Sequence, residues 1–235
     1  MRLSTPVESI EQDLRGVRLA TPVGAVRAHA AILTVSTAVL AEGSTVLPPD
    51  LDAWRHAAAC LPLGPNEKLF LEVVGDSPFA PETRVLGKPP DRRIGVYNIR
   101  PFGWPVIECF LRDEGARMVG EMGPAAGFTH ATDQLAALFG SRVRRSLHPL
   151  VASNWGRMTY VGGADSHALP GHTGARRALA RPFEHRLFFA GEATHANDLS
   201  TAHGAHDSGV RAAEEVIAAL TPTTTAAGIP SDRQR

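Results

Sequence analysis

Potential metal ligands gather in one short stretch of the sequence, GEATHANDLSTAHGAHDSG, between Gly191 and Gly209. Imidazole and carboxylate groups at close spacing can hold a transition metal that activates water for hydrolysis. The stretch contains five such residues: His195, Asp198, His203, His206 and Asp207. Ser200 and Ser208 add hydroxyl groups of the type that a Ser/His/Asp hydrolase uses. Neither chemistry has its usual pattern, since HExxH, a cysteine cluster and a GxSxG elbow are missing here.

The glycines and small residues of the same stretch favour a different ligand. Gly191 ends a short apolar strand and permits close approach of a ligand or another backbone. Glu192 follows at once and is placed to accept hydrogen bonds from ligand hydroxyls. Residues 201–205, TAHGA, open a helix whose free N–H groups and dipole favour negative charge. This combination suits a flavin cofactor, and an ordinary α/β packing glycine pair is the alternative.

Alternating strand and helix patterns must position these residues. The predicted strands are 16–21, the start of 31–40, 67–74, 93–99, 105–111, 143–153 and 186–191, and the predicted helices are 50–61, 116–122, 130–140 and 210–220. The run from Ala31 is typical of a strand buried on both faces. Asp50 is the expected N-cap of its helix, and the proline in 143–153 places that strand at an edge.

Composition excludes several classes of protein. The chain has 235 residues, 43% of them hydrophobic, and a formal net charge of zero, which indicates a globular protein without a surface for nucleic acid or an anionic membrane. No apolar run is long enough to span a bilayer, and the N-terminus shows no secretory signal. Two cysteines, Cys60 and Cys109, do not form a disulfide framework, so we expect a reducing, cytoplasmic setting. The polar tail 221–235 is predicted to be disordered.

The segment LFFAGEATHANDLSTAHGAHDSGVRAAEEV resembles the C-terminal flavin-binding segment of the FAD-dependent amine oxidases, the family of monoamine oxidases, polyamine oxidases and flavin-dependent histone demethylases. The matching motifs are A-G-E at 190–192, T-x-H-G-A at 201–205 and S-G at 208–209. The resemblance extends upstream and covers nearly the whole chain to about residue 220. MRLSTPVESI resembles the family's adenine-contacting strand, with Val7 at the matching position.

The resemblance implies an α/β fold: the C-terminal part of an FAD-binding Rossmann-type domain, interleaved with a mixed-sheet α+β substrate domain. The FAD portions would be 1–43 and 153–220, the substrate portion 44–152, and the tail 221–235. The activity would be oxidation of a C–N bond in a small-molecule amine, by hydride transfer to flavin N5 and reoxidation by oxygen. FAD would be bound non-covalently, because residues 160–164 lack the cysteine that attaches it in some members.

The resemblance also implies roles for single residues. Lys68 matches the lysine that approaches flavin N5 through a water, although it could be an ordinary surface lysine. Trp155, in SNWGRMTYVGG, matches a tryptophan beside the isoalloxazine, with core packing as the alternative. Gly191 and Glu192 would lie at the ribityl and phosphate region, and the backbone of Thr201 and Ala202 would contact the flavin pyrimidine.

The chain departs from the family in two respects. It contains no GxGxxG turn for the pyrophosphate, and residues 197–201 lack the aromatic side chains that flank the amine. We therefore expect the rest of the FAD site to come from elsewhere, either from a separate partner chain or from a missing part of the same polypeptide. A non-catalytic fragment or subunit of a split flavoenzyme is the second hypothesis, and a metal-dependent hydrolase is the third. Apolar surface left exposed would make the chain poorly soluble or dependent on a partner.

Overall fold

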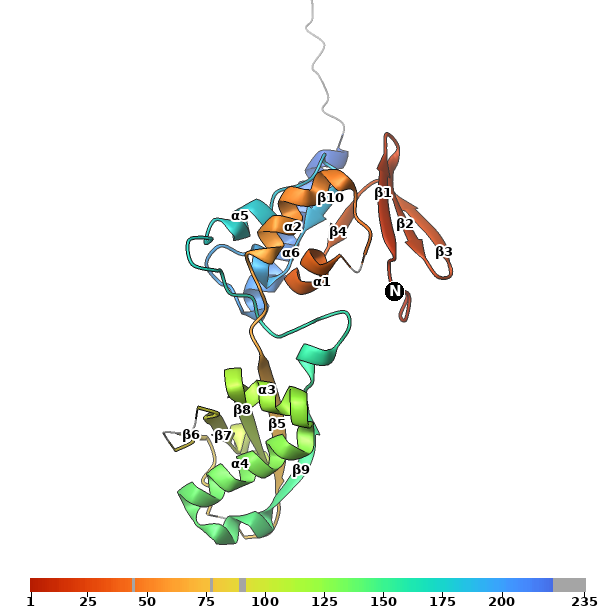
Figure 1. Ribbon diagram of the computed structural model, residues 1–235. Coiled ribbons are helices and arrows are strands. Elements are labelled where there is room, and N and C mark those ends of the chain that lie inside the picture. Colours follow the sequence, from red (N-terminus) through yellow and green to blue (C-terminus); the bar gives the residue numbers. More distant parts are fainter. Residues whose placement is uncertain (44, 77, 89–91, 222–235) are drawn as a thin grey trace, which may run out of the picture.

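Two lobes are joined where two stretches of chain cross side by side (Figure 1). The structure, a computed structural model, describes residues 1–43, 45–76, 78–88 and 92–221. At the crossing, Gly64 N–H donates to the Asp165 carbonyl at 2.8 Å, and Ala164 N–H donates to the Gly64 carbonyl at 3.1 Å. The strand that enters the second lobe and the loop that returns from it are therefore held in register.

A three-stranded antiparallel sheet begins the first lobe, in the order β1 (Ser9–Asp13), β2 (Gly16–Thr21) and β3 (Gly24–Ala28). β2 confirms the strand predicted at 16–21. This sheet lies beside the rest of the lobe (Figure 1).

A parallel pair of short strands forms the centre of the first lobe. β10 (Leu187–Phe189) pairs with β4 (Ala31–Leu33), which joins segments far apart in the sequence. Leu187 and Phe189 pack with residues of α1 (Thr37–Glu42), α2 (Asp52–Ala59) and α5 (Ala175–Leu179). Phe188 points the other way and packs against α6 (Ala202–Leu220). Helices on both faces of parallel strands confirm the α/β class.

The strand that was predicted to begin at Ala31, buried on both faces, differs from the observed one in length and in burial. β4 ends at Leu33, and the Ser36 side chain then caps α1 by accepting a hydrogen bond from Val39 N–H at 3.2 Å. Ile32 is 40% exposed, because the cluster that α6 forms around Phe188 does not include it. An N-cap serine after a three-residue strand thus converts the rest of the apolar run into a helix.

The helix predicted at 50–61 starts later than expected. A 3₁₀ turn, η1 (Pro49–Leu51), takes the first residues, and its geometry is fixed by a bond from Asp52 N–H to the Pro49 carbonyl. Asp50 therefore lies inside the turn and is not the N-cap of α2. Leu51, Ala58 and Leu61, which lie in the predicted range, are fully buried.

The second lobe is a five-stranded sheet covered by helices on one face (Figure 1). The strands, in spatial order, are β6 (Thr83–Leu86), β7 (Gly95–Ile99), β8 (Val106–Arg112), β5 (Asn66–Val73) and β9 (Leu147–Ala152). Every pairing among these strands is antiparallel, so the predicted mixed sheet is wrong for the described residues. For β6, β7 and β8 the reason is local, because strands that follow one another in the chain and pair side by side run antiparallel.

The packing of the second lobe follows the predicted patterns closely. Leu69, Leu71 and Val73 share the buried side of β5, and α3 (Asp113–Met122) and α4 (Pro124–Phe139) cover them. α4 ends at Gly140 as predicted, although it begins earlier than residue 130. β9, which contains Pro149, is an edge strand, as its proline predicted.

The packing around α2 joins residues on both sides of residue 44, where the predicted domain boundary lies. Leu47, Leu51 and Leu61 share a core cluster with Leu187 and Phe189 of the first lobe. The domain ranges as a whole stay a prediction. Of the predicted tail, all but Thr221 lies outside the described residues.

Two further findings concern the environment of the chain. Within the described part, no helix combines the length and apolar character needed to cross a membrane. Cys60 and Cys109 are both buried and unpaired.

Candidate cofactor site

A cavity of about 260 Å³ opens at the carboxyl ends of the parallel strands β4 and β10. Ligands of open α/β sheets bind at this end of the strands. The cavity wall comes from residues that follow both strands and from the two crossing segments, among them Thr34, Ser36, Leu63, Val161, Gly191 and Glu192. Gly191 and Glu192, both predicted to bind a cofactor, therefore lie together at this cavity.

Gly191 makes the turn from β10 into the cavity wall. Its φ is 132°, a conformation that side chains rarely adopt, and open space surrounds the position that a Cβ atom would take. Its N–H donates to Ser208 Oγ at 2.8 Å, and its carbonyl accepts from Thr194 N–H at 3.0 Å. The strand end is thus tied to α6 on one side and to the short turn η5 (Glu192–Thr194) on the other.

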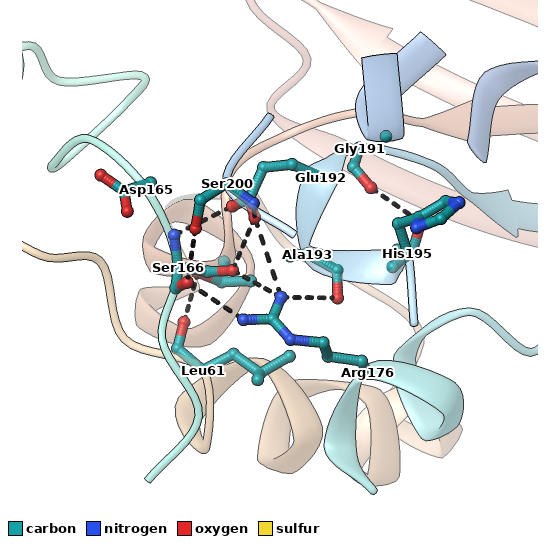
Figure 2. Close-up of polar contacts among 12 residues, drawn as sticks. Leu61, Asp165, Ser166, Arg176, Gly191, Glu192, Ala193, His195 and Ser200 are labelled. Atoms are coloured by element: carbon teal, nitrogen blue, oxygen red, sulfur yellow. Dashed lines mark hydrogen bonds and ion pairs between the residues drawn. The ribbon is translucent and has the colours of Figure 1, made fainter. Parts of the chain in front are cut away.

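The Glu192 carboxylate connects three segments of the first lobe, as Figure 2 shows. Oε1 accepts from Ser166 N–H at 3.0 Å, and Oε2 accepts from the Ser166 hydroxyl and from Ser200 N–H, both at 2.9 Å. Ser166 belongs to the loop that returns from the second lobe, and Ser200 directly precedes the N-cap of α6. Glu192 therefore joins these segments at the cavity rim, and its two oxygens are largely occupied by the three hydrogen bonds that do so.

A buried arginine from α5 completes this cluster (Figure 2). Arg176 is only 4% exposed, and its guanidinium donates to Ser166 Oγ at 2.8 Å and to the Ser166 carbonyl at 3.0 Å. It also donates to the Ala193 carbonyl at 3.4 Å and lies 3.7 Å from Glu192 Oε2. Burial lowers the pKa of Arg176 from its ordinary value, and the Glu192 carboxylate opposes that shift. The guanidinium neutralises the charge that Glu192 brings to the cavity.

The start of α6 presents open backbone donors. Thr201 is the N-cap, and its hydroxyl accepts from Gly204 N–H at 3.1 Å while it donates to the Asp198 carbonyl at 2.6 Å. A Cβ at Gly204 would lie 1.9 Å from that same carbonyl oxygen, so only glycine fits. The N–H groups of Ala202 and His203 have no partner within the described residues. They are free for an acceptor, as helix geometry predicts.

Trp155 lies where the chain leaves the second lobe. It begins the 3₁₀ turn η4 (Trp155–Arg157) and is 42% exposed, so it is not a core residue. Its N–H donates at 3.2 Å to the buried carboxylate of Glu67, which lies next to Lys68 on β5.

Lys68 lies on the face of the second-lobe sheet that α3 and α4 leave uncovered. Its ammonium donates to Glu108 Oε1 at 2.5 Å, and its nitrogen is 5.8 Å from the centre of the Phe110 ring. Glu108 also accepts from Asn98 Nδ2 at 2.9 Å. Burial raises the pKa of Glu108, but the hydrogen bonds from Lys68 and Asn98, with attraction to Lys68 and Arg84, outweigh it and leave the pKa below its ordinary value.

Comparison with known proteins decides the family. A sequence model of the flavin-containing amine oxidoreductases matches residues 1–217, which is most of the chain. The chain belongs to the flavin-containing amine oxidoreductase family. The cofactor of this family is FAD, as the resemblance implied.

Named relatives are similar to this chain along nearly its whole length. Polyamine oxidase 4 of Oryza sativa subsp. japonica is 29% identical over 224 residues, which cover 92% of this chain and 45% of the relative. Polyamine oxidase 2 of Arabidopsis thaliana is 27% identical over 223 residues, covering 92% and 44%. Lysine-specific histone demethylase 1 homolog 3 of Arabidopsis thaliana is 28% identical over 224 residues, covering 90% and 14%. The chain thus spans less than half the length of these relatives.

The residues at the cavity fit part of an FAD molecule. Open space at Gly191 allows a ligand to approach the strand end. The predicted cofactor residues Thr201 and Ala202 do not line the cavity, although the free N–H groups of Ala202 and His203 at the start of α6 suit an electron-rich acceptor. Glu192 fits less simply, because three hydrogen bonds from Ser166 and Ser200 already occupy its oxygens. Its direct contact with a ribityl chain stays a prediction.

Val7 is placed apart from the other predicted cofactor residues. It precedes β1 and packs against the core cluster of the first lobe, and its carbonyl accepts from the Thr45 hydroxyl at 3.0 Å. Its predicted contact with adenine stays a prediction.

The histidines of the C-terminal stretch contact residues near them in the sequence. His195 Nδ1 accepts from Asp198 N–H at 2.8 Å, and His206 contacts its neighbour Asp207 at 3.1 Å. Within residues 1–221 and outside their gaps, no three His, Cys, Asp or Glu side chains lie close enough to hold a metal ion. The geometry therefore gives the metal-hydrolase hypothesis no site in this part of the chain.

Sequence reasoning missed three residues that organise the site: Glu67, Ser166 and Arg176. None belongs to a recognisable motif, and Arg176 is followed by a second arginine with the same local composition. Their roles depend on contacts between segments distant in sequence, so no local pattern marks them.

Proposed function

We propose that this chain forms part of an FAD-dependent amine oxidoreductase. The observation that carries the proposal is the cavity at the ends of β4 and β10, where the A-G-E motif of a flavin-family chain is held by Ser166, Ser200 and Arg176. Bound FAD would supply the electron acceptor for oxidation of a C–N bond by hydride transfer to N5, with oxygen as the final acceptor.

The chain's own residues would hold and orient the cofactor. The turn at Gly191 would admit it to the strand end, and Arg176 would hold Glu192 in place at the rim. Ala202 and His203 N–H groups, at the positive end of the α6 dipole, would favour negative charge on the flavin pyrimidine. Thr201 would preserve this arrangement by capping the helix. Val7 would contribute backbone contacts to the adenine.

The second lobe would supply the substrate side. Lys68 and Trp155 are linked through the hydrogen bonds of their backbones, because Lys68 N–H donates to Ser153 Oγ and Trp155 N–H donates to Glu67, the neighbour of Lys68 on β5. In the proposed enzyme, Lys68 would hold a water near the reacting atoms and Trp155 would pack beside the ring. We propose a small-molecule amine as the substrate, because the relatives are named polyamine oxidases.

The second candidate is a partial FAD site, called here a half-site, which another polypeptide segment completes. The apolar residues Val210, Ala213, Ile217 and Leu220 form an exposed stripe on α6, and Ile32 of β4 is also partly exposed. Surfaces of this kind favour contact with a further segment or a separate chain. In this case the chain alone would bind FAD weakly or not at all.

Flavin titration tests both candidates. FAD is added to the purified chain while the quenching of flavin fluorescence is followed, and the complex is then reduced anaerobically with spermidine. Quenching followed by bleaching of the visible absorbance supports the oxidoreductase. Glu192→Gln should weaken FAD binding, whereas Glu214→Gln, on the exposed face of α6, serves as the control.

Absence of quenching would reject the first candidate for the isolated chain and leave the half-site. Quenching without reduction by any amine would retain the cofactor site and reject the amine substrate.

A further inference from the structure

A carboxylate occupies a core-facing position at the start of β5. Glu67 alternates with Leu69 and Leu71, which pack under α3 and α4, and it is only 4% exposed. A buried carboxylate is costly unless hydrogen bonds compensate for the lost water. No lysine or arginine of the described residues pairs with it, so the compensation comes from neutral donors.

All of these donors come from the segment that leaves β9. Glu67 Oε2 accepts from the Ser153 hydroxyl at 2.5 Å and from Trp155 N–H at 3.2 Å, and Oε1 accepts from Gly156 N–H at 3.3 Å. One carboxylate thus fixes the first turn of η4, including the tryptophan.

The same contacts reach Lys68 through Ser153. The Ser153 hydroxyl accepts from Lys68 N–H at 2.8 Å while it donates to Glu67, and Ser153 N–H donates to the Lys68 carbonyl at 2.8 Å. Glu67, Ser153 and the backbone of Lys68 form a closed set of hydrogen bonds. The position of the Trp155 backbone relative to the Lys68 backbone therefore depends on the Glu67 carboxylate as well as on the pairing of Ser153 with Lys68.

We infer that Glu67 is a positioning residue, which holds Trp155 and Lys68 in a fixed relation to each other. The inference rests on the proposed function where it places both residues beside the flavin. Glu67 itself contacts neither side chain, so its effect on the reaction passes through the backbone that it holds. Removing one of its acceptor oxygens frees the tryptophan turn.

The first experiment needs no flavin. Trp54 and Trp104 are replaced by phenylalanine so that Trp155 is the remaining tryptophan, and Glu67→Gln is introduced into this background. The amide keeps one acceptor and loses the other, so we expect lower fluorescence anisotropy of Trp155 and stronger quenching by acrylamide. Glu72→Gln, on the exposed face of the same strand, is the matched control and should change neither value. An unchanged Trp155 signal in a folded Glu67→Gln protein overturns the inference.

The second experiment uses the full chain loaded with FAD. Glu67→Gln should shift the visible flavin spectrum and slow amine-dependent flavin reduction by about 10- to 100-fold, with little change in substrate affinity. A looser Trp155 with an unaltered flavin spectrum and rate overturns the positioning role.

Two controls separate the possible failures. If Glu67→Gln does not fold, Ser153→Ala replaces it. This variant removes the hydroxyl that joins Glu67 to the Lys68 N–H and keeps the bond from Trp155 N–H to Glu67, so the Trp155 signal should stay unchanged while amine-dependent flavin reduction slows. An unaltered reduction rate in that variant counts against the inference. If the wild-type chain binds no FAD, the proposed function fails, and the fluorescence experiment still decides whether Glu67 holds Trp155.

Discussion

The absence of a Cβ atom at Gly204 allows the first turn of α6 to pack closely on the preceding loop. Gly204 packs so closely on the Asp198 carbonyl that a Cβ would approach it to 1.9 Å, whereas Gly209, five residues further along the same helix, has open space at the same position. We predict that Gly204→Ala destabilises the protein by about 1–3 kcal/mol, the usual cost of overpacking. Gly209→Ala should stabilise it by about 0.5–1 kcal/mol, because alanine favours a helix.

Urea unfolding of the two variants measures this difference directly. The pair is matched in residue type and in helix, so equal effects at both positions would contradict the close packing at Gly204.

The lowered pKa of Glu108 predicts that the free energy of unfolding depends on pH. Its pKa in the folded state lies below the ordinary value, because hydrogen bonds and attraction from Lys68 and Asn98 outweigh the effect of burial. A lowered folded-state pKa stabilises the protein above the unfolded pKa, and this stabilisation is lost as the pH falls through the folded value. Glu108→Gln should therefore lose less stability between pH 6 and pH 3, whereas Glu121→Gln, on exposed α3 surface, should follow the wild type.

The free energy of unfolding, measured by urea at several pH values, checks the prediction. A Glu108→Gln curve parallel to the wild-type curve would show that the carboxylate has no such role.

At the scale of elements, periodic patterns predicted most of the structure. β5, β7, β8, α4 and α6 each have a run of apolar residues with one clear period, because each packs one face on a core. The strand predicted from Ala31 was too long, because the apolar composition of the run does not show that Ser36 caps a helix there. The Gly191 and Glu192 corner was also predicted, since its motif is contiguous.

The remainder of the site could not be predicted from local patterns. Ser166 and Arg176 lie on a loop and a short helix without periodicity, and they reach Glu192 only when three segments assemble. The antiparallel order of the second sheet likewise depends on how hairpins stack.

The link between α5 and the cavity rim is testable as a coupling between two charges. Arg176→Met removes three hydrogen bonds and leaves Glu192 without its counter-ion, so we expect a loss of about 2–3 kcal/mol. In the Glu192→Gln background, the same substitution should cost at least about 1 kcal/mol less, because no unpaired charge remains.

A double-mutant cycle by chemical denaturation gives the coupling energy. Strictly additive effects would mean that the 3.7 Å pair contributes nothing beyond the separate hydrogen bonds of each residue.

For the whole molecule, the two lobes share few contacts beyond the crossing, where Glu67 and Asn66 meet the returning loop. The Asn66 side-chain amide donates to the Asp165 carboxylate, and Arg112 Nε donates to Asn66 Oδ1 at 3.2 Å. The parts that would serve cofactor and substrate are thus connected by polar contacts, next to the residues proposed to act together.

The exposed stripe on α6 leads to a prediction about the behaviour of the chain in solution. α6 buries Gly204, Ser208 and Ala212, and Ala212 and Val216 pack with Phe188 of β10, whereas Val210, Ile217 and Leu220 face outward, with Ile217 65% exposed. Ile217→Glu should change the free energy of unfolding by less than about 0.5 kcal/mol and lower self-association in light scattering. Ala212→Glu, on the buried face of the same helix, should prevent folding, because it would bury an unpaired charge. Destabilisation by Ile217→Glu comparable to that by Ala212→Glu would mean that the stripe is part of the core and not a surface for association.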